Sequence, residues 1–395
     1  MRNGASAILL AAALTLPVSN AAAVPYTFSN LYDSSGPFNG FDVPYLNNSG
    51  TVAFAADFDT GGSGIFTGSG GSTTTIVDTS GPFADLRGYS LNNAGTVAFL
   101  VGNARVFTGS GGPITTIFSG QGFDDFVISL SINDNGTVAL LAELEREGFF
   151  TGGIFTGRGG PLTPLYEEIG GTSSGFGNFV PINDSGTVAF LAFLDPFGSV
   201  EGIVTGSGGP TTTIADNSGL FSDFYSSDAN PTSTYDLNDN GRVAFLVNLD
   251  AGGAGIFIGN GGATTTIVDT SGPFLFFFSF GGGQAPGFSL NNSGAVAFSA
   301  ALDTGGFGIF TGPDALVDEV ISVDDPLFGS TVAELLMGEG SLNDTGQIAF
   351  FYELADGRTG IARADPLAIP EPGTLALLGL GLLGLALTRR RANSP

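Results

Sequence analysis

Apolar and polar positions along the chain recur as one module. The pattern Asn-x-x-Gly-x-(Val/Ile)-Ala-(Phe/Leu) occurs seven times, at spacings of 41 to 55 residues. Its Asn and Gly members are Asn47 and Gly50, Asn92 and Gly95, Asn133 and Gly136, Asn183 and Gly186, Asn238 and Gly241, Asn291 and Gly294, and Asn343 and Gly346. Asn first and Gly fourth are typical of a type I turn, so we interpret these residues as structural. The apolar run after each turn does not alternate, which predicts a strand covered on both faces.

Two further elements follow each turn. The first resembles residues 64–68 (Gly-Ile-Phe-Thr-Gly), and turn residues such as 59–62 precede it, so it predicts a β-hairpin with the strand before it. A Gly-rich turn then leads to a Thr-rich strand such as residues 73–76, with weaker versions at 162–165 and 315–317. A variable segment before the next Asn, for example residues 86–91, predicts a fourth strand.

The repeat predicts the fold class. Four-stranded units at a period of roughly 40–50 residues are typical of propeller blades. The seventh copy ends after its second element, and residues 28–38 align with the Thr-rich strand and turn at 73–83. Both chain ends therefore contribute to one blade, which leaves no open sheet edge. We predict an all-β fold, a seven-bladed β-propeller over residues 24–365, whose N-terminal strand closes the last blade.

The two ends of the chain predict its destination. Arg2, an apolar stretch and small residues up to Ala23 are typical of a cleaved signal peptide over residues 1–23. In the tail, residues 366–395, Pro370, Glu371 and Pro372 precede a short apolar helix, predicted over 374–387, and a cationic cluster. That cluster consists of Arg389, Arg390 and Arg391. An apolar helix followed by cations is a stop-transfer element, which predicts transient membrane insertion; an ordinary single-pass anchor is the alternative.

This three-part tail resembles the PEP-CTERM sorting signal of Gram-negative bacteria. The resemblance implies that an exosortase-type transpeptidase recognises Pro370, Glu371 and Pro372, and that the protein is released or attached at the cell surface. The tandem Asn-x-x-Gly-x-x-Ala-Phe units resemble a bacterial surface-protein family defined by that repeat, whose biochemical role is not established.

Composition narrows the possible chemistry. The chain has 395 residues, 37 acids, 11 arginines and neither Cys nor His, with a formal net charge of −26. Metal sites built on thiolate or imidazole and nucleophiles activated by His are therefore excluded. So acidic a chain repels nucleic acid, which we do not expect as a partner. We expect no cofactor beyond weak Ca²⁺ binding by carboxylate and carbonyl oxygens.

Paired carboxylates are the one catalytic device that this composition permits. The acids that depart from the repeat are Glu143, Glu145, Glu147, Glu167 and Glu168, and a solvated loop is the alternative interpretation.

The Phe-rich residues 274–280 predict either an exposed patch or a strand buried between blades, and residues 216–231 are a similar insertion. We assign no catalytic residue and predict an exported binding or structural protein of the cell surface or exopolysaccharide matrix. A carboxylate-dependent glycan-active enzyme or a lectin is the alternative.

Overall fold

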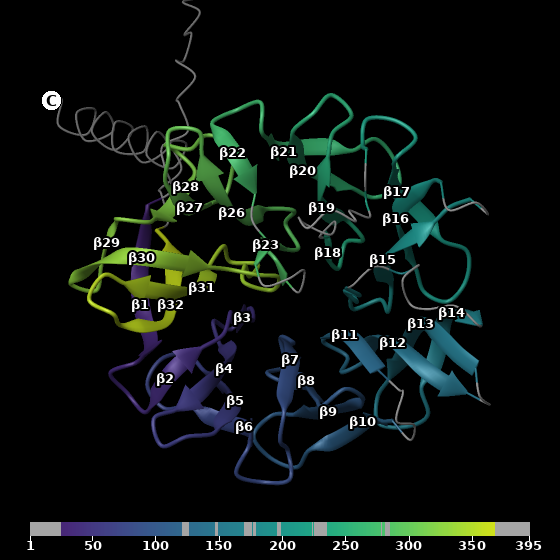
Figure 1. Ribbon diagram of the computed structural model, residues 1–395, viewed down its shortest axis with the longest axis horizontal. Helices are drawn as coiled ribbons and strands as arrows, with labels where there is room; N and C mark the ends of the chain where they lie inside the picture. The colour runs from purple at the N-terminus through teal and green to yellow at the C-terminus, as the bar shows by residue number, and fades with distance from the viewer. Residues whose placement is uncertain are drawn as a thin grey trace, which may run out of the picture.

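The computed structural model describes residues 25–120, 126–146, 149–169, 176, 179–195, 199–222, 224, 235–277, 279–280 and 285–367. These residues form an all-β fold of seven antiparallel sheets arranged as blades around a central axis (Figure 1). The predicted seven-bladed propeller is thus confirmed. The predicted signal peptide and C-terminal apolar helix lie outside the described residues. Among the described residues, no helix has the length and apolar character needed to span a membrane.

The first four blades follow one another along the chain. Blade 1 comprises β2 (Phe38–Phe41), β3 (Tyr45–Leu46), β4 (Val52–Phe58), β5 (Ser63–Gly68) and β6 (Thr74–Asp78). Blade 2 comprises β7 (Leu86–Leu91), β8 (Val97–Val101), β9 (Arg105–Gly109) and β10 (Thr115–Ser119). Blade 3 comprises β11 (Phe126–Ile132), β12 (Val138–Arg146), β13 (Phe149–Gly157) and β14 (Thr163–Ile169). Blade 4 comprises β15 (Val188–Phe193), β16 (Glu201–Gly206) and β17 (Thr212–Asp216).

The remaining three blades complete the circle. Blade 5 comprises β18 (Tyr235–Leu237), β19 (Val243–Asn248), β20 (Ala254–Gly259) and β21 (Thr265–Asp269). Blade 6 comprises β22 (Phe274–Phe277), β25 (Phe288–Leu290), β26 (Val296–Leu302), β27 (Phe307–Phe310) and β28 (Glu319–Ser322), beside the small hairpin of β23 (Ser279–Phe280) and β24 (Ala285–Pro286). Blade 7 comprises β29 (Pro326–Leu327), β30 (Ser330–Leu336), β31 (Ile348–Leu354), β32 (Thr359–Pro366) and β1 (Tyr26–Asp33).

The hydrophobic core lies between the blades rather than inside any one of them. Seven clusters of buried side chains fill the seven interfaces between neighbouring sheets. In β4, Val52 and Phe54 pack toward blade 7, whereas Ala53 between them packs toward blade 2, and all three are fully buried. The non-alternating apolar run is therefore covered on both faces, as predicted from the sequence.

One predicted strand was wrong. Residues 315–317 form a turn instead of the third strand of blade 6, and that strand is β28, which begins at Glu319. The Asp314 carboxylate accepts hydrogen bonds from the backbone N–H groups of Leu316 and Val317, at 3.0 and 3.2 Å, and so holds the turn. A side chain that binds nearby backbone groups in this way favours a turn over a strand.

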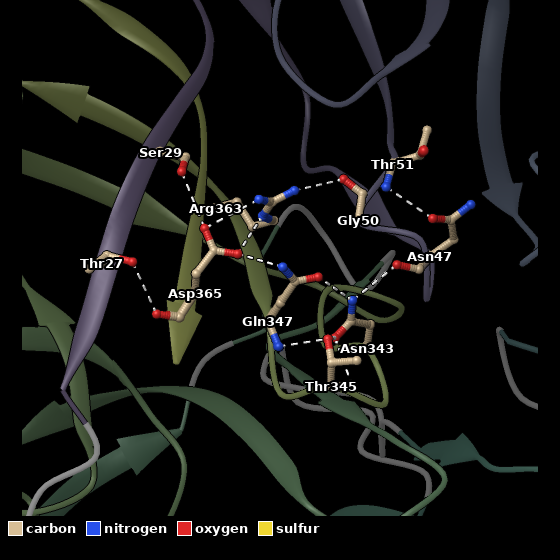
Figure 2. Close-up of polar contacts among 10 residues, drawn as sticks. All are labelled: Thr27, Ser29, Asn47, Gly50, Thr51, Asn343, Thr345, Gln347, Arg363 and Asp365. Carbon is tan, nitrogen blue, oxygen red and sulfur yellow. Dashed lines mark hydrogen bonds and ion pairs between the residues drawn. The ribbon is translucent and has the colours of Figure 1, made fainter. Parts of the chain in front are cut away.

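The N-terminal strand closes the ring, as predicted. β1 pairs with β32 in antiparallel register from Tyr26–Pro366 to Asp33–Gly360, and the two strands lie side by side in Figure 1. A polar network extends this closure to blade 1 (Figure 2). Asp365 accepts hydrogen bonds from Ser29 of β1 and from Arg363, and the Arg363 guanidinium also donates to the backbone carbonyl of Gly50 at 3.0 Å. The Arg363–Asp365 ion pair is largely buried, so solvent screens it less than an exposed pair.

The Thr-rich strands and the Gly-rich turns of the repeat fit each other across blade boundaries. The methyl group of Thr74 in β6 lies where a side chain on Gly111 of blade 2 would be, 2.2 Å from the added Cβ. Thr115 and Gly159 repeat the arrangement between blades 2 and 3, and Thr212 and Gly261 repeat it between blades 4 and 5. The two motifs therefore recur together because each threonine methyl packs on the bare backbone of the next turn.

We expect Gly111→Ala to destabilise the protein by about 2 kcal/mol, because Gly111 has φ +88° and an added methyl would meet Thr74. Gly112→Ala is the matched control, since its φ is outside the left-handed region and no atom lies within 4 Å of the added Cβ. The free energy of unfolding of the control should stay within about 0.5 kcal/mol of the wild type in urea titrations. Equal loss in both variants would contradict this account of the repeat.

Candidate functional site

The seven predicted turns converge at one end of the central axis, which we call the crown. Each of their first Asn side chains is at least 95 % buried. In every turn the Asn Oδ1 accepts the backbone N–H four residues on, at 2.9 to 3.0 Å. Each Asn Nδ2 donates to the backbone carbonyl of the equivalent Asn in the next blade, at 2.9 to 3.5 Å. The last link, from Asn343 to Asn47, closes a ring of seven hydrogen bonds.

A second ring lies on the more exposed side of the first. It consists of the residues that follow each Asn, namely Asn48, Asn93, Asp134, Asp184, Asp239, Asn292 and Asp344. Each backbone N–H donates to the side-chain Oδ1 of the next member, at 2.7 to 2.9 Å, and Asp344 returns the ring to Asn48. Only an acceptor is needed for this link, so Asn and Asp are interchangeable here.

The crown encloses a polar depression of about 180 Å³. An apolar layer lies below it, made by the residue before each Asn: Leu46, Leu91, Ile132, Ile182, Leu237, Leu290 and Leu342. Three neighbouring members of the second ring are acids, namely Asp134, Asp184 and Asp239. Burial raises the pKa of Asp184, and repulsion from Asp239 and Asp134 adds to the rise. In the described part of the chain, no cluster of three or more carboxylates is arranged to hold a metal ion.

We expect Asn92→Asp to cost about 3 kcal/mol of stability. The replacement keeps Oδ1 but turns the Nδ2 donor, 2.9 Å from the Asn133 carbonyl, into a buried carboxylate oxygen without a hydrogen to donate. Asp184→Asn is the control. It replaces a carboxylate of the second ring by an amide and keeps the Oδ1 acceptor. Its urea midpoint should match or slightly exceed that of the wild type. A wild-type midpoint for Asn92→Asp would rule out the ring as a stabilising element.

Buried acids lie among the innermost strands, outside the crown. Glu339 is 8 % exposed, accepts a short hydrogen bond from the Tyr45 hydroxyl through Oε1, and has no hydrogen-bond partner for Oε2 among the described residues. Burial and, to a smaller degree, repulsion from Asp236 raise the pKa of Glu339 well above its usual value, although the Tyr45 hydrogen bond opposes the rise. Asp236 accepts backbone N–H groups of Leu237 and Leu290, both at 2.8 Å, yet burial raises its pKa to about 6.

These raised pKa values make the fold more stable in acid. A carboxyl whose pKa is higher in the folded state contributes stability below its unfolded value, about 4.3 for Glu, and loses it as the pH rises through the folded value. Glu339→Gln should therefore raise the urea midpoint at pH 8 and leave it unchanged at pH 4. The exposed Glu334→Gln in the same blade should alter neither midpoint. Asp236 also stabilises the fold in acid, and this stabilisation is lost as the pH rises to about 6. Both variants should keep this part of the pH dependence. A lower midpoint for Glu339→Gln at pH 8 would mean that the carboxylate stabilises the fold.

The opposite end of the ring, the distal face, carries exposed apolar side chains. The strand that follows each crown turn begins at the crown and ends at this face. At this face, blades 3, 4, 5 and 6 expose Phe126, Phe193, Leu194, Leu220, Leu275 and Phe276. The two interpretations of the Phe-rich segment both hold in part. Phe274 and Phe277 are buried, whereas Leu275 and Phe276 of the same strand are 57 % and 41 % exposed.

The candidate catalytic acids are distributed over blade 3. Backbone register places Glu143, Gly152 and Glu168 in one row across β12, β13 and β14, whereas Glu167 belongs to the neighbouring row opposite Gly153. Two strand spacings therefore separate the backbones at Glu143 and Glu168 by roughly 10 Å. Glu145 lies further along β12, opposite Phe150, and Glu147 lies outside the described residues. The sorting residues Pro370, Glu371, Pro372, Arg389, Arg390 and Arg391 also lie outside them.

The fold and the chain ends define an exported seven-bladed propeller that carries a sorting signal. The PEP-CTERM protein-sorting motif matches residues 368–391, which identifies a protein exported by Gram-negative bacteria to the cell surface or extracellular space and implies recognition by an exosortase. A family of unknown function, DUF7453, matches residues 101–309 and 329–376, and the chain belongs to this family. No curated protein sequence matches the chain.

Solved structures share the architecture at low sequence identity. A puromycin-hydrolysing peptidase of Mycobacterium tuberculosis is 12 % identical, with a TM-score of 0.54 over 87 % of this chain and 55 % of the peptidase. The chain thus spans about half the length of that enzyme, and the likeness concerns the fold alone. A prolyl endopeptidase gives 14 % identity and a TM-score of 0.49 over 85 % of this chain and 51 % of that chain. The polysaccharide lyase Uly1 is 10 % identical in sequence, with a TM-score of 0.47 over 86 % of this chain and 92 % of the lyase.

Proposed function

We propose that this protein is a non-enzymatic binding or structural component of the cell surface or exopolysaccharide matrix, and that it meets extracellular polysaccharide through its distal face. The observation that carries the proposal is the position of the chain ends. Pro366 pairs with Tyr26, and Ala364 pairs with Ile348, which directly follows the last crown turn. Both ends therefore leave blade 7 on the crown side, and the tail begins there.

This position orients the ring. While the apolar tail is inserted in the membrane, or attached after transpeptidation, the crown side lies toward the cell and the distal face lies away from it. The hydrogen-bonding atoms of the crown are largely consumed by its two rings, whereas the distal face exposes large apolar side chains on four consecutive blades. Two of the exposed sets are neighbours in the chain, Phe193 with Leu194 and Leu275 with Phe276, and clustered apolar surface is typical of binding sites. Any Ca²⁺ binding by the acidic surface is weak and nonspecific in this proposal.

Replacing Pro370, Glu371 and Pro372 together by Ala should abolish transpeptidation, because the motif is the segment that the exosortase recognises. In the native host, immunoblots should then show only the unprocessed chain in the membrane fraction and none at the surface or in the matrix. Glu334→Ala, an exposed acid in blade 7, is the control and should be processed like the wild type. Normal processing of the triple variant would contradict the proposal.

A hydrolysis assay distinguishes the proposed binding function from the alternative of a glycan-active enzyme. Incubation of the processed protein with matrix polysaccharide should release no oligosaccharide in this proposal. Release that is abolished by Glu143→Gln would replace the binding function by a carboxylate-dependent enzyme.

A further inference from the structure

A groove on the distal face is large enough for a sugar chain. It has a volume of about 410 Å³ and lies between blades 5 and 6. Its lining consists of Asn248, Leu249, Gly252, Gly253, Ala254, Thr270, Leu275 and Phe276. The glycines at the tip of the β19–β20 hairpin carry no side chain that would fill the space.

The apolar wall of this groove is held in place from behind. Phe274 and Phe277 flank the exposed pair in β22 and are buried in the core between blades 5 and 6, and Phe274 packs edge-on against Phe298 and Phe310. The β-bulge between Phe274 and Phe276, where β22 pairs with β26, lets Leu275 and Phe276 both face outward. A fixed aromatic wall loses little conformational entropy when a ligand packs on it.

Two exposed acids lie close to segments that line the groove. Asp250 is exposed beside the lining residue Leu249, and its backbone N–H donates to the carbonyl of Leu220 at 3.1 Å. Asp303 is exposed on the blade 6 side, and its backbone N–H donates to the carbonyl of Pro273, two residues before Leu275. Arg242 is the one basic residue between positions 159 and 357, and it lies at the crown, where its backbone N–H donates to Asn238.

This combination selects among possible ligands. Anionic polysaccharides and nucleic acid are repelled, and a second copy would bring the same acids against each other. A polymer of amino sugars fits, because each ring offers an apolar face of C–H groups for Phe276 and Leu275 and an ammonium group for Asp250 and Asp303. An ammonium group also gains from lying over an aromatic ring.

We infer that the groove between the β19–β20 hairpin and β22 binds polysaccharide rich in free amino sugars. This inference rests on the proposed function and names the class of matrix polysaccharide that the distal face recognises.

The test is calorimetric titration of the processed protein with three hexasaccharides: glucosamine, its N-acetylated counterpart and a uronic acid oligomer. The glucosamine hexamer should bind at least tenfold more tightly than the N-acetylated one, and the uronic acid oligomer should not bind. Binding of the glucosamine hexamer should weaken at 0.5 M salt, because exposed charges are then screened.

Variants locate the site. Phe276→Ser should weaken glucosamine binding about tenfold through the lost apolar wall, and Asp250→Asn, which keeps the shape of the side chain, should weaken it severalfold. Leu316→Ser is the control, since Leu316 is 88 % exposed and lies outside the groove. Wild-type affinity in both groove variants would overturn the inference.

Two results separate this inference from the proposed function. Equal binding of the N-acetylated and free hexamers would overturn the amino-sugar preference and leave the matrix-binding function standing. Binding of none of the three hexamers, together with no retention of the protein by native matrix polysaccharide, would overturn both.

Discussion

The closed ring of Asn side chains at the crown is the constraint on which the rest of the structure depends. Each Asn uses Oδ1 to hold its own turn and Nδ2 to reach the backbone carbonyl of the next blade. Asn combines an acceptor and a donor on one short side chain, whereas Asp lacks the donor. This requirement explains why the first turn position is Asn in all seven repeats. The backbone link at the second position needs only an Oδ1 acceptor, and that position is Asn in three repeats and Asp in four.

The same ring explains why the chain must be circular. Seven identical links close only if the last blade lies beside the first, and the Asn343–Asn47 bond is that link. Blade 7 can pack in this place only as a full sheet, which β1 supplies by pairing with β32. The Arg363–Asp365 pair then connects the completed blade to Gly50 in the first crown turn. Closure of the sheet and closure of the crown are thus parts of one cooperative arrangement.

Much of this architecture could be predicted from the sequence because it repeats. The alignment of residues 28–38 with residues 73–83 identified the closing strand. The variable strand before the Asn92 turn was predicted with its observed bounds, Leu86–Leu91, although it pairs with β8 in the sheet of the next repeat. The two rings were missed because turn propensity already accounts for Asn and Gly, although the absence of Asp at the first position was an available signal. Glu339 and Asp236 were missed because each occurs in one blade, where no repeat marks it. The wrong strand at 315–317 arose because apolar residues outweighed the turn signal of Asp314.

The two ends of the ring differ in how freely their residues can vary, and this difference follows from the geometry of the crown. Residues at the crown are fixed by neighbours on both sides, so a change that creates a ligand site there breaks a bond that closure requires. At the distal face each blade ends independently, and blades 3 to 6 differ there in exposed side chains and in length. The proposed orientation adds a second reason, because it turns the invariant crown toward the cell. In that proposal the surface free to vary is also the surface presented to the outside, and specificity can change there without reopening the ring.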